Sequence, residues 1–156
     1  MYILKAYMIV KMQTAFINSP LGITKIVGDE NGITEISVTS EGVISEIIPT
    51  ELQEAATQLS DYFDGKRKDF NFKLNPKGTD FQQKVWQELL QIPFGKTISY
   101  LDLSKKLGDV KAIRAVASAN GKNPLWIVVP CHRVIGTDGS LTGYAGGLWR
   151  KKWLLE

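Results

Sequence analysis

The hydrophobic pattern changes from alternation to helical spacing near residues 75–79, and this change limits the possible folds more than any other feature. Before it, residues 12–39 contain three β-branched or aromatic runs separated by Ser-Pro-Leu-Gly and Asp-Glu-Asn-Gly. Such runs between turn residues are typical of a small antiparallel sheet. After it, apolar residues recur at helical spacing. We therefore expect two domains, over residues 1–78 and 79–156, joined by the linker Asn-Pro-Lys-Gly-Thr.

The first domain is expected to hold most of the strands. Asn31-Gly32 predicts a type I′ hairpin turn, because that turn needs positive φ at both central residues. Residues 68–74, Lys-Asp-Phe-Asn-Phe-Lys-Leu, form a further possible strand. This half contains no histidine and no cysteine. We find no catalytic constellation in it.

One amphipathic helix is predicted on each side of the linker. Residues 50–63 follow helical spacing, and Thr50 can open a capping box three residues before a glutamine. Residues 80–91 place large apolar side chains on one face, with Thr79 or Asp80 as the cap. The second helix stops before a proline, which cannot continue it. The chain is therefore expected to fold as an α/β protein.

Two further short helices, one ending at Gly108 and one over residues 111–120, resemble a helix-turn-helix. That pattern is weak alone, since many helical hairpins bind nothing. The second helix carries several small side chains and one long cation, Arg114. Packing against the first helix explains about half of the small residues. They cannot all face inward, and a small-residue face bearing one arginine suits close approach to a nucleic-acid groove.

The charge distribution is consistent with a nucleic-acid partner. The net charge is +3. Residues 1–78 hold 8 Lys and Arg against 10 Asp and Glu, giving −2, while residues 79–156 hold 11 against 6, giving +5. A basic half attracts polyanions, although a solvated basic face is an equally good explanation of the charge alone.

The remaining composition argues against a membrane protein and a secreted one. No apolar stretch approaches the ~20 residues of a membrane span. The first ten residues, Met-Tyr-Ile-Leu-Lys-Ala-Tyr-Met-Ile-Val, are apolar but lack the basic start and cleavage site of a signal peptide. One cysteine cannot form an internal disulfide framework. We expect a cytoplasmic protein.

The only cysteine, Cys131, stands beside the only histidine, His132, after the apolar run 125–129. Pro130 pushes its predecessor toward extended geometry, so the run predicts a buried strand or extended segment that ends in a turn at the cysteine. Nearby basic groups, His132 and Arg133, favour the nucleophilic thiolate. The alternative is a cysteine that simply fills the core.

The pair limits the possible chemistry. One cysteine and one histidine cannot form a four-ligand zinc site, so no metal is expected. A papain-like protease would need a distant histidine with an orienting partner. Adjacent residues on extended chain point to opposite sides, so a water between Cys131 and His132 is more plausible than direct contact.

The motifs Pro-Cys-His-Arg-Val-Ile-Gly, Arg-Ala-Val-Ala-Ser-Ala-Asn-Gly-Lys-Asn-Pro and Gly-Tyr-Ala-Gly-Gly-Leu-Trp-Arg-Lys-Lys-Trp-Leu-Leu together resemble the O6-alkylguanine-DNA alkyltransferases. The resemblance is dense over residues 79–156 and weaker before them. It implies a small N-terminal RNase H-like α/β domain, with a three-stranded antiparallel sheet plus helix, and a mostly helical, winged-helix-like C-terminal domain that binds DNA.

The resemblance also implies an activity: irreversible transfer of an alkyl group from O6-alkylguanine, and also from O4-alkylthymine, to Cys131. The base is flipped out of double-stranded DNA, and each molecule acts once, as a monomer, without a cofactor. His132 would polarise Cys131 through water, Tyr100 would donate to the leaving guanine, and Asn123 would brace the active-site turn.

Arg114 would fill the gap left by the flipped nucleotide. The further residues implied at the DNA surface are Lys111, Ala112, Ala115, Ser118 and Arg133. Those implied at the base pocket are Trp126, Val134, Tyr144, Ala145 and Gly146.

Two positions depart from the family pattern. The family places a glutamate that orients the histidine three residues beyond the second leucine of Leu-Leu, and here Glu156 directly follows that leucine, Leu155. Glu156 would point about 200° away on a helix. Ala145 stands where a serine often contacts the alkylated oxygen. Two other functions stay open: a helix-turn-helix module that recognises alkylated DNA without chemistry, which Cys131 argues against, and a turnover cysteine hydrolase.

Overall fold

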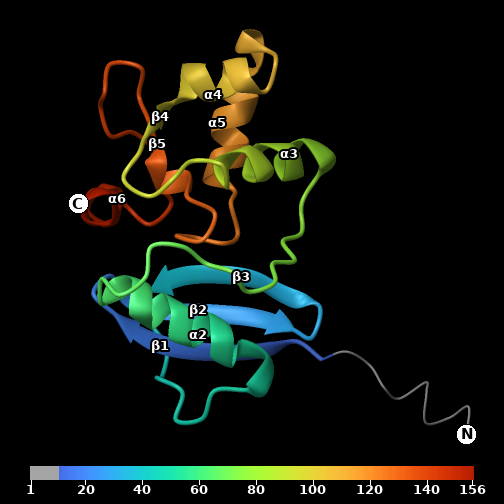
Figure 1. The fold of residues 1–156 in the computed structure, drawn as a ribbon, viewed down its shortest axis with the longest axis vertical. Helices are drawn as coiled ribbons and strands as arrows, with labels where there is room; N and C mark the ends of the chain where they lie inside the picture. The colour runs from blue at the N-terminus through green and yellow to red at the C-terminus, as the bar shows by residue number, and fades with distance from the viewer. Residues whose placement is uncertain (1–10) are drawn as a thin grey trace, which may run out of the picture.

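The computed structural model describes residues 11–156; the apolar segment considered above as a possible signal peptide lies outside them. The N-terminal half is a sheet with one helix, and the C-terminal half is a group of helices stacked on it (Figure 1). No helix among residues 11–156 is both long enough and apolar enough to cross a membrane.

The sheet has three antiparallel strands in the order β1-β2-β3. The strands are β1 (Gln13–Ser19), β2 (Gly22–Asp29) and β3 (Gly32–Thr39), and helix α2 (Thr50–Phe63) packs on one face. Alternate strand residues such as Ala15, Ile26 and Ile36 are fully buried. The predicted sheet and helix are therefore confirmed.

The predicted type I′ turn is wrong in detail. The loop is Glu30-Asn31, Asp29 pairs with Gly32, and Asn31 does not have positive φ. The Asp29 carboxylate accepts the Asn31 amide hydrogen at 2.7 Å, which stabilises the shifted turn. Gly32 has a φ of 130°, and a Cβ there would lie 3.0 Å from the carbonyl oxygen of Lys73. Glycine is therefore needed in the strand rather than inside the turn.

The predicted capping box at Thr50 is also wrong. Pro49 is the N-cap of α2 and makes no side-chain cap bond, while Gln53 donates to the carbonyl of Ile48 at 3.1 Å. The predicted strand 68–74 is reduced to one parallel bridge between Leu74 and Ile33.

The C-terminal half begins with α3 (Asp80–Leu89), whose Thr79–Gln82 capping box is present as one of the two predicted caps. The two predicted short helices are α4 (Tyr100–Lys106) and α5 (Ile113–Gly121), which follows a 3-10 turn (Val110–Ala112). The fold continues with a second 3-10 turn (Cys131–Arg133) and ends with helix α6 (Leu148–Leu155). Between them lies strand β5 (Val134–Ile135), which pairs in parallel with β4 (Ile98–Ser99).

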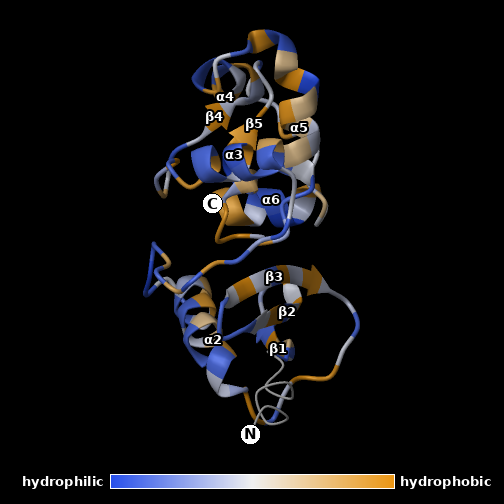
Figure 2. Cartoon of the chain, turned by 90° about the vertical axis from the view of Figure 1, so that its right-hand side faces the viewer, coloured by the Kyte–Doolittle hydropathy of each residue, from blue (hydrophilic) through white to orange (hydrophobic). Residues whose placement is uncertain are grey.

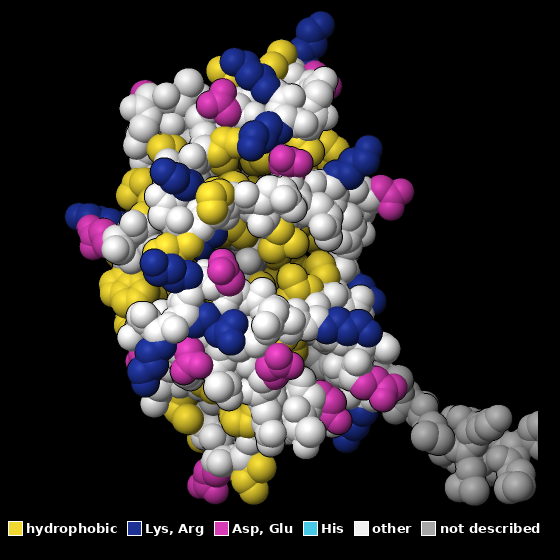
Figure 3. Space-filling model, viewed as in Figure 1, with side chains coloured by type: hydrophobic (Ala, Val, Ile, Leu, Met, Phe, Trp, Pro, Cys, Tyr) yellow, Lys and Arg dark blue, Asp and Glu magenta, His cyan; other side chains and the backbone are white. Residues whose placement is uncertain are grey.

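Polarity follows this arrangement. The side of α3 turned to the viewer in Figure 2 is hydrophilic, whereas β4 and β5 are hydrophobic. On the face in Figure 3, lysine and arginine side chains are spread over the upper, C-terminal half, and acidic side chains are more frequent on the lower half. This agrees with the charges of −2 and +5 counted above from the sequence.

The two halves are joined by main-chain pairing at the edge of the sheet. The Ile36 amide donates to the Pro124 carbonyl at 2.8 Å, and the Trp126 amide donates to the Ile36 carbonyl at 3.0 Å. Arg150 on α6 adds a second link, donating from Nε to the Leu21 carbonyl at 2.9 Å. The segment before Cys131 is therefore held by β3.

Candidate active site

The apolar run before Cys131 forms tight turns, so the predicted strand is wrong. Only Leu125 pairs, in a bridge to Ile36. Ile127 has a φ of 75°, the only positive value for a non-glycine residue within 11–156. The Val129 amide then donates to the Leu125 carbonyl at 3.0 Å, and the Cys131 amide to the Val129 carbonyl at 2.8 Å. Cys131 consequently opens a 3-10 turn instead of ending a strand.

Asn123 holds these turns from inside. It is 3% exposed, its Nδ2 donates to the carbonyls of Val129 at 2.7 Å and Leu125 at 3.3 Å, and its Oδ1 accepts from the Leu125 amide at 2.9 Å. A buried amide that replaces sheet hydrogen bonds in this way lets a β-branched segment fold into turns.

Cys131 is a protonated thiol at neutral pH. It is 5% exposed, and burial raises its pKa to about 11, against smaller opposing effects of the Asn123 hydrogen bond and the Lys151 charge. The prediction that His132 and Arg133 favour the thiolate is wrong. Arg133 donates to the Ile92 carbonyl at 2.8 Å and lies over the Phe94 ring.

The same contacts correct the prediction of Arg133 as a DNA-binding residue. Its side chain is buried between Ile92 and Phe94, on the side of the reactive turn that adjoins the first domain. A guanidinium held by a buried carbonyl is not available to a phosphate.

His132 is a neutral imidazole. It is fully buried, and desolvation lowers its pKa to about 3, assisted by the charges of Arg133 and Lys151. Neither ring nitrogen has a hydrogen-bond partner among residues 11–156. Glu156 lies 4.0 Å from Lys152 on the exposed face of α6 and does not orient the histidine. The geometry therefore leaves both ring nitrogens free to meet a bridging water.

Lys151 was missed from the sequence, although it is a buried cation whose charge acts on Cys131. It is fully buried on α6, and Nζ donates to the carbonyls of Val134 at 2.6 Å and Thr142 at 2.8 Å. Burial lowers its pKa, while Cys131 raises it. A usable signal existed, because Lys151 falls three residues after Leu148 and three before Leu154, on the apolar stripe of its helix.

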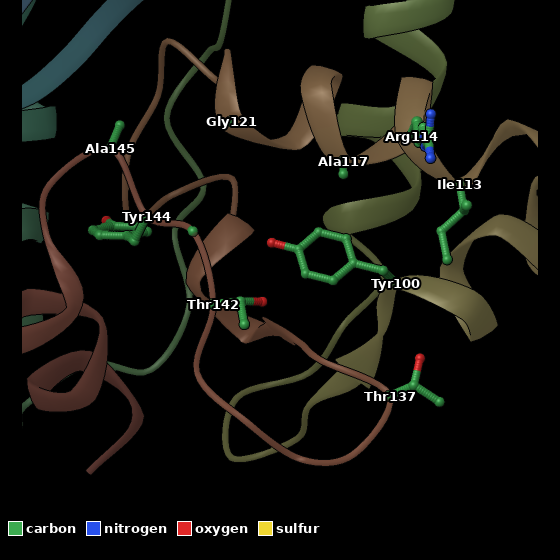
Figure 4. Close-up of a pocket in the computed structure, with 10 residues that line it drawn as sticks. Tyr100, Ile113, Arg114, Ala117, Gly121, Thr137, Thr142, Tyr144 and Ala145 are labelled. Atoms are coloured by element: carbon green, nitrogen blue, oxygen red, sulfur yellow. The ribbon is translucent and has the colours of Figure 1, made fainter.

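A cavity of about 750 Å³ opens between α5 and the loop before α6 (Figure 4). Its size falls within the usual range for small-molecule sites. Its lining residues are Tyr100, Ile113, Arg114, Ala117, Gly121, Thr137, Thr142, Gly143, Tyr144 and Ala145. The Tyr100 hydroxyl points into the space between α5 and the Thr142–Tyr144 segment (Figure 4).

Tyr100 and Cys131 are electrostatically coupled. Burial raises the pKa of Tyr100, and the Cys131 charge raises it further, while hydrogen bonds from Asn120 and Thr142 lower it. Tyr100 is therefore a protonated phenol at neutral pH. Because it lies at the start of α4, a short rigid helix fixes its position.

Only two of the five predicted pocket residues line the cavity. Tyr144 and Ala145 line the cavity, whereas Trp126 and Gly146 lie behind Tyr144. The Trp126 and Tyr144 rings are 5.8 Å apart, and a Cβ on Gly146 would lie 2.8 Å from the Tyr144 ring. Glycine is thus required where the loop crosses the rings. Val134 is fully buried and is not among the lining residues.

Four of the residues predicted at the DNA surface are exposed and recur at helical spacing: Lys111 in the 3-10 turn before α5, and Arg114, Ala115 and Ser118 on α5 itself. Ala112 is an exception, because it is partly buried and packs against the core. Within residues 11–156, no three His, Cys, Asp or Glu side chains are grouped so that they could hold a metal ion.

Cys131 is not among the residues that line the cavity, but it interacts electrostatically with Tyr100 and Tyr144, which are. A buried cysteine coupled to such a cavity, together with an exposed arginine on the helix pair at its edge, is typical of DNA-modifying proteins that react through cysteine. The chain belongs to the 6-O-methylguanine DNA methyltransferase family: residues 12–76 match its ribonuclease-like domain and residues 80–156 its DNA binding domain. This confirms the resemblance and the fold class inferred from the sequence.

Relatives and solved structures agree. The chain is 44% identical over 147 residues to the methylated-DNA–protein-cysteine methyltransferase of Methanosarcina barkeri, covering 90% of this chain and 92% of that protein. It is 47% identical over 137 residues to the constitutive Bacillus subtilis enzyme, covering 82% and 83%. The crystal structure of Mycobacterium tuberculosis O6-methylguanine methyltransferase superposes with a TM-score of 0.83 at 41% identity, covering 93% and 91%. A structure of the same M. tuberculosis protein contains DNA.

Proposed function

We propose that this protein repairs DNA by transferring an alkyl group from O6 of guanine to its own Cys131. The observation that carries the proposal is that the only cysteine is buried and interacts electrostatically with Tyr100 and Tyr144, two residues that line the cavity. The names of the relatives and the DNA complex of the M. tuberculosis protein support it.

The reaction is a direct displacement. The Cys131 sulfur forms a bond to the alkyl carbon as the carbon–O6 bond breaks, and the electron pair of that bond goes to the guanine. The thiol proton leaves toward His132 through a water, Tyr100 gives its proton to the guanine, and the proton that the thiol released then passes from His132 to Tyr100 and restores the phenol. The net result is a thioether on Cys131 and an ordinary guanine. A thioether is stable, so each molecule acts once.

Lys151 supports this step because its charge favours the thiolate form of Cys131. The resting thiol is neutral, and its proton has to leave as the sulfur attacks. A buried ammonium held by two carbonyls stabilises negative charge without moving, which is the usual means by which preorganised sites lower a barrier. His132 can accept a proton only transiently, since its pKa is about 3 in the resting protein.

The target base has to leave the duplex to reach the cavity. Arg114 lies both on the exposed face of α5 and on the rim of the cavity. We assign it to the space that the flipped nucleotide vacates, with Lys111, Ala115 and Ser118 against the groove. Unstacking costs a few kcal/mol, and less for a damaged base.

The partner is double-stranded DNA with O6-alkylguanine, and O4-alkylthymine is a second substrate. We propose that the protein acts as a monomer in the cytoplasm, because one chain supplies the thiol, the cavity and the exposed helix. Residues 1–78 form the supporting domain and residues 79–156 the reactive one.

Mass spectrometry tests the proposal. After incubation with a duplex that contains one O6-methylguanine, the peptide with Cys131 should gain one CH₂, in a one-to-one burst. Cys131→Ala should bind the same duplex without gaining mass. Binding without mass gain by the wild-type chain would indicate the module without chemistry, and multiple turnover would indicate a hydrolase or another enzyme.

A further inference from the structure

Asn120, which has no role in the mechanism so far, connects the reactive turn to the proton donor. It lies on the inner side of α5 and is 2% exposed. Its Nδ2 is 3.4 Å from the carbonyl oxygen of Cys131 and 3.5 Å from the phenol oxygen of Tyr100. Its Oδ1 is buried without a hydrogen-bond partner among residues 11–156. A buried amide with an unmatched oxygen carries a desolvation penalty that a leucine would avoid.

The direction of these hydrogen bonds follows from the chemistry of the partners. A main-chain carbonyl can only accept, so the amide group that faces Cys131 has to be Nδ2. The second hydrogen of Nδ2 then faces Tyr100, whose oxygen accepts it. The phenol's own hydrogen therefore points away from Asn120, and the Tyr100 hydroxyl lies at the cavity, where Thr142 is its other hydrogen-bond partner (Figure 4).

We propose that Asn120 is a positioning residue that aims the Tyr100 proton at the leaving guanine. The inference rests on the proposed function. As Tyr100 gives up its proton, its oxygen gains negative charge, and the hydrogen bond from Asn120 becomes charge-assisted and stronger. The bond is therefore worth most in the transition state, where it accelerates transfer rather than tightening DNA binding. The same hydrogen bond lowers the pKa of Tyr100 against the effect of burial.

A double-mutant cycle with Tyr100→Phe tests the proposal. The measurement is the single-turnover rate of methyl transfer from saturating O6-methylguanine duplex, together with the duplex affinity. Asn120→Leu should slow transfer roughly three- to tenfold, the range of one hydrogen bond, with unchanged affinity. In the Tyr100→Phe background, Asn120→Leu should change the rate less than about twofold, because the group through which it acts is gone.

Ser104→Ala is the matched control. Ser104 is also buried, but its hydroxyl donates to the main-chain carbonyl of Tyr100 at 2.8 Å and does not contact the phenol. Any rate loss from Ser104→Ala should be the same in both backgrounds. Denaturant unfolding checks that each variant is folded, and Asn120→Ala replaces Asn120→Leu if the leucine does not fold.

Three results would overturn the inference. Equal rate losses from the Asn120 variant in both backgrounds would assign it a purely structural role at Cys131. An Asn120 variant that transfers the methyl group at the wild-type rate would show that its hydrogen bond to Tyr100 does not contribute to the reaction. A Tyr100→Phe variant that reacts at the wild-type rate would remove the proton donor itself. Failure of the proposed function looks different, because wild-type Cys131 would then gain no mass at all.

Discussion

Among single residues, the charge of the site is located on Lys151, while Cys131 and His132 are both neutral. This differs from a thiolate–imidazolium pair, in which the cysteine is already ionised before substrate arrives. The cause is burial: desolvation raises the cysteine pKa to about 11 and lowers the histidine pKa to about 3. The protonated thiol therefore reacts slowly with electrophiles in solution. In the proposed reaction it loses its proton only as it attacks the alkyl group of a bound base.

The protonated thiol leads to a pH prediction. Because the Cys131 pKa is raised to about 11, the thiolate fraction should rise tenfold per pH unit throughout the range below it. Labelling of Cys131 by iodoacetamide should follow that slope from pH 7 to 9.5 without a plateau, whereas an ordinary thiol levels off near its pKa of ~8.5. Mass spectrometry of the labelled peptide gives the rate.

Lys151→Met provides the control for this titration. It removes the cation that favours the thiolate, so labelling should be slower than in the wild type at every pH in the range. A plateau near neutral pH in the wild type would instead mean that the thiol is ionised, and the assignment of a neutral pair would be wrong.

The sequence indicated the residues that we propose to react better than those that we propose to tune them. Cys131, His132 and Tyr100 carry recognisable chemistry within a specific motif. Asn120 and Lys151 do not, because an asparagine among alanines and a lysine in a basic helix are ordinary until tertiary packing buries them. The prediction that Arg133 favours the thiolate was wrong for the reverse reason. Arg133 lies close to the cysteine in sequence, but its side chain contacts Ile92 and Phe94 instead.

At the scale of elements, the helices and the three strands of the sheet followed the hydrophobic period, whereas the strands predicted over 68–74 and before Cys131, the hairpin turn and the cap of α2 did not. In both of the following cases, residues outside the segment determined its local conformation. Asn123 folds the apolar run before Cys131 into turns, and the chain near Leu74 fixes the glycine position of the β2–β3 hairpin. A sequence window around the hairpin does not contain residues 73–75 and cannot anticipate the second outcome, whereas the first was implied by the family resemblance, which assigned Asn123 to brace the turn.

Helix α5 carries the second prediction. If Arg114 occupies the space of the flipped nucleotide, Arg114→Ala should react slowly with alkylated duplex but almost normally with free O6-benzylguanine. The loss on duplex should stay within the unstacking cost of a few kcal/mol and shrink when the lesion is mispaired. Single-turnover rates on the three substrates measure this.

Lys111→Ala is the matched variant, because Lys111 is exposed in the 3-10 turn directly before α5, one turn from Arg114, and does not line the cavity. As a phosphate contact, it should weaken duplex affinity, reduce the salt slope by about one unit and be insensitive to mispairing. If Arg114→Ala behaves like Lys111→Ala, its role is electrostatic; equal losses on free base and duplex would make it structural.

On the scale of the whole molecule, Arg150 ties the reactive half to the sheet. Its Nε donates to the Leu21 carbonyl at 2.9 Å, its Nη1 donates to the Gly146 carbonyl at 2.8 Å, and its guanidinium lies 4.5 Å from the Trp149 ring centre. The β1–β2 turn of the first domain and the pocket loop of the second therefore share one side chain.

Arg150→Ala should lower the free energy of unfolding by about 1.5–3 kcal/mol, the range for a hydrogen bond to a charged group. Urea denaturation followed by circular dichroism measures the loss. The neighbouring Lys152→Ala, which removes only an exposed ion pair at 4.0 Å, should change it by less than about 1 kcal/mol. Equal effects of the two substitutions would argue that Arg150 does not join the halves.

The pairing of Ile36 with Leu125 also affects the order in which the protein folds during and after its synthesis. The sheet is synthesised first and can form early, but the turns that shield Cys131 need an edge that lies 89 positions back along the chain (125 minus 36). Until that long-range contact forms, the thiol of the newly synthesised chain is exposed to solvent, and its pKa is that of a cysteine in an unfolded peptide. A nascent molecule can thus be oxidised or alkylated before it has met DNA, so the supply of working protein in a stressed cell depends on the speed of its folding as well as on the rate of its synthesis.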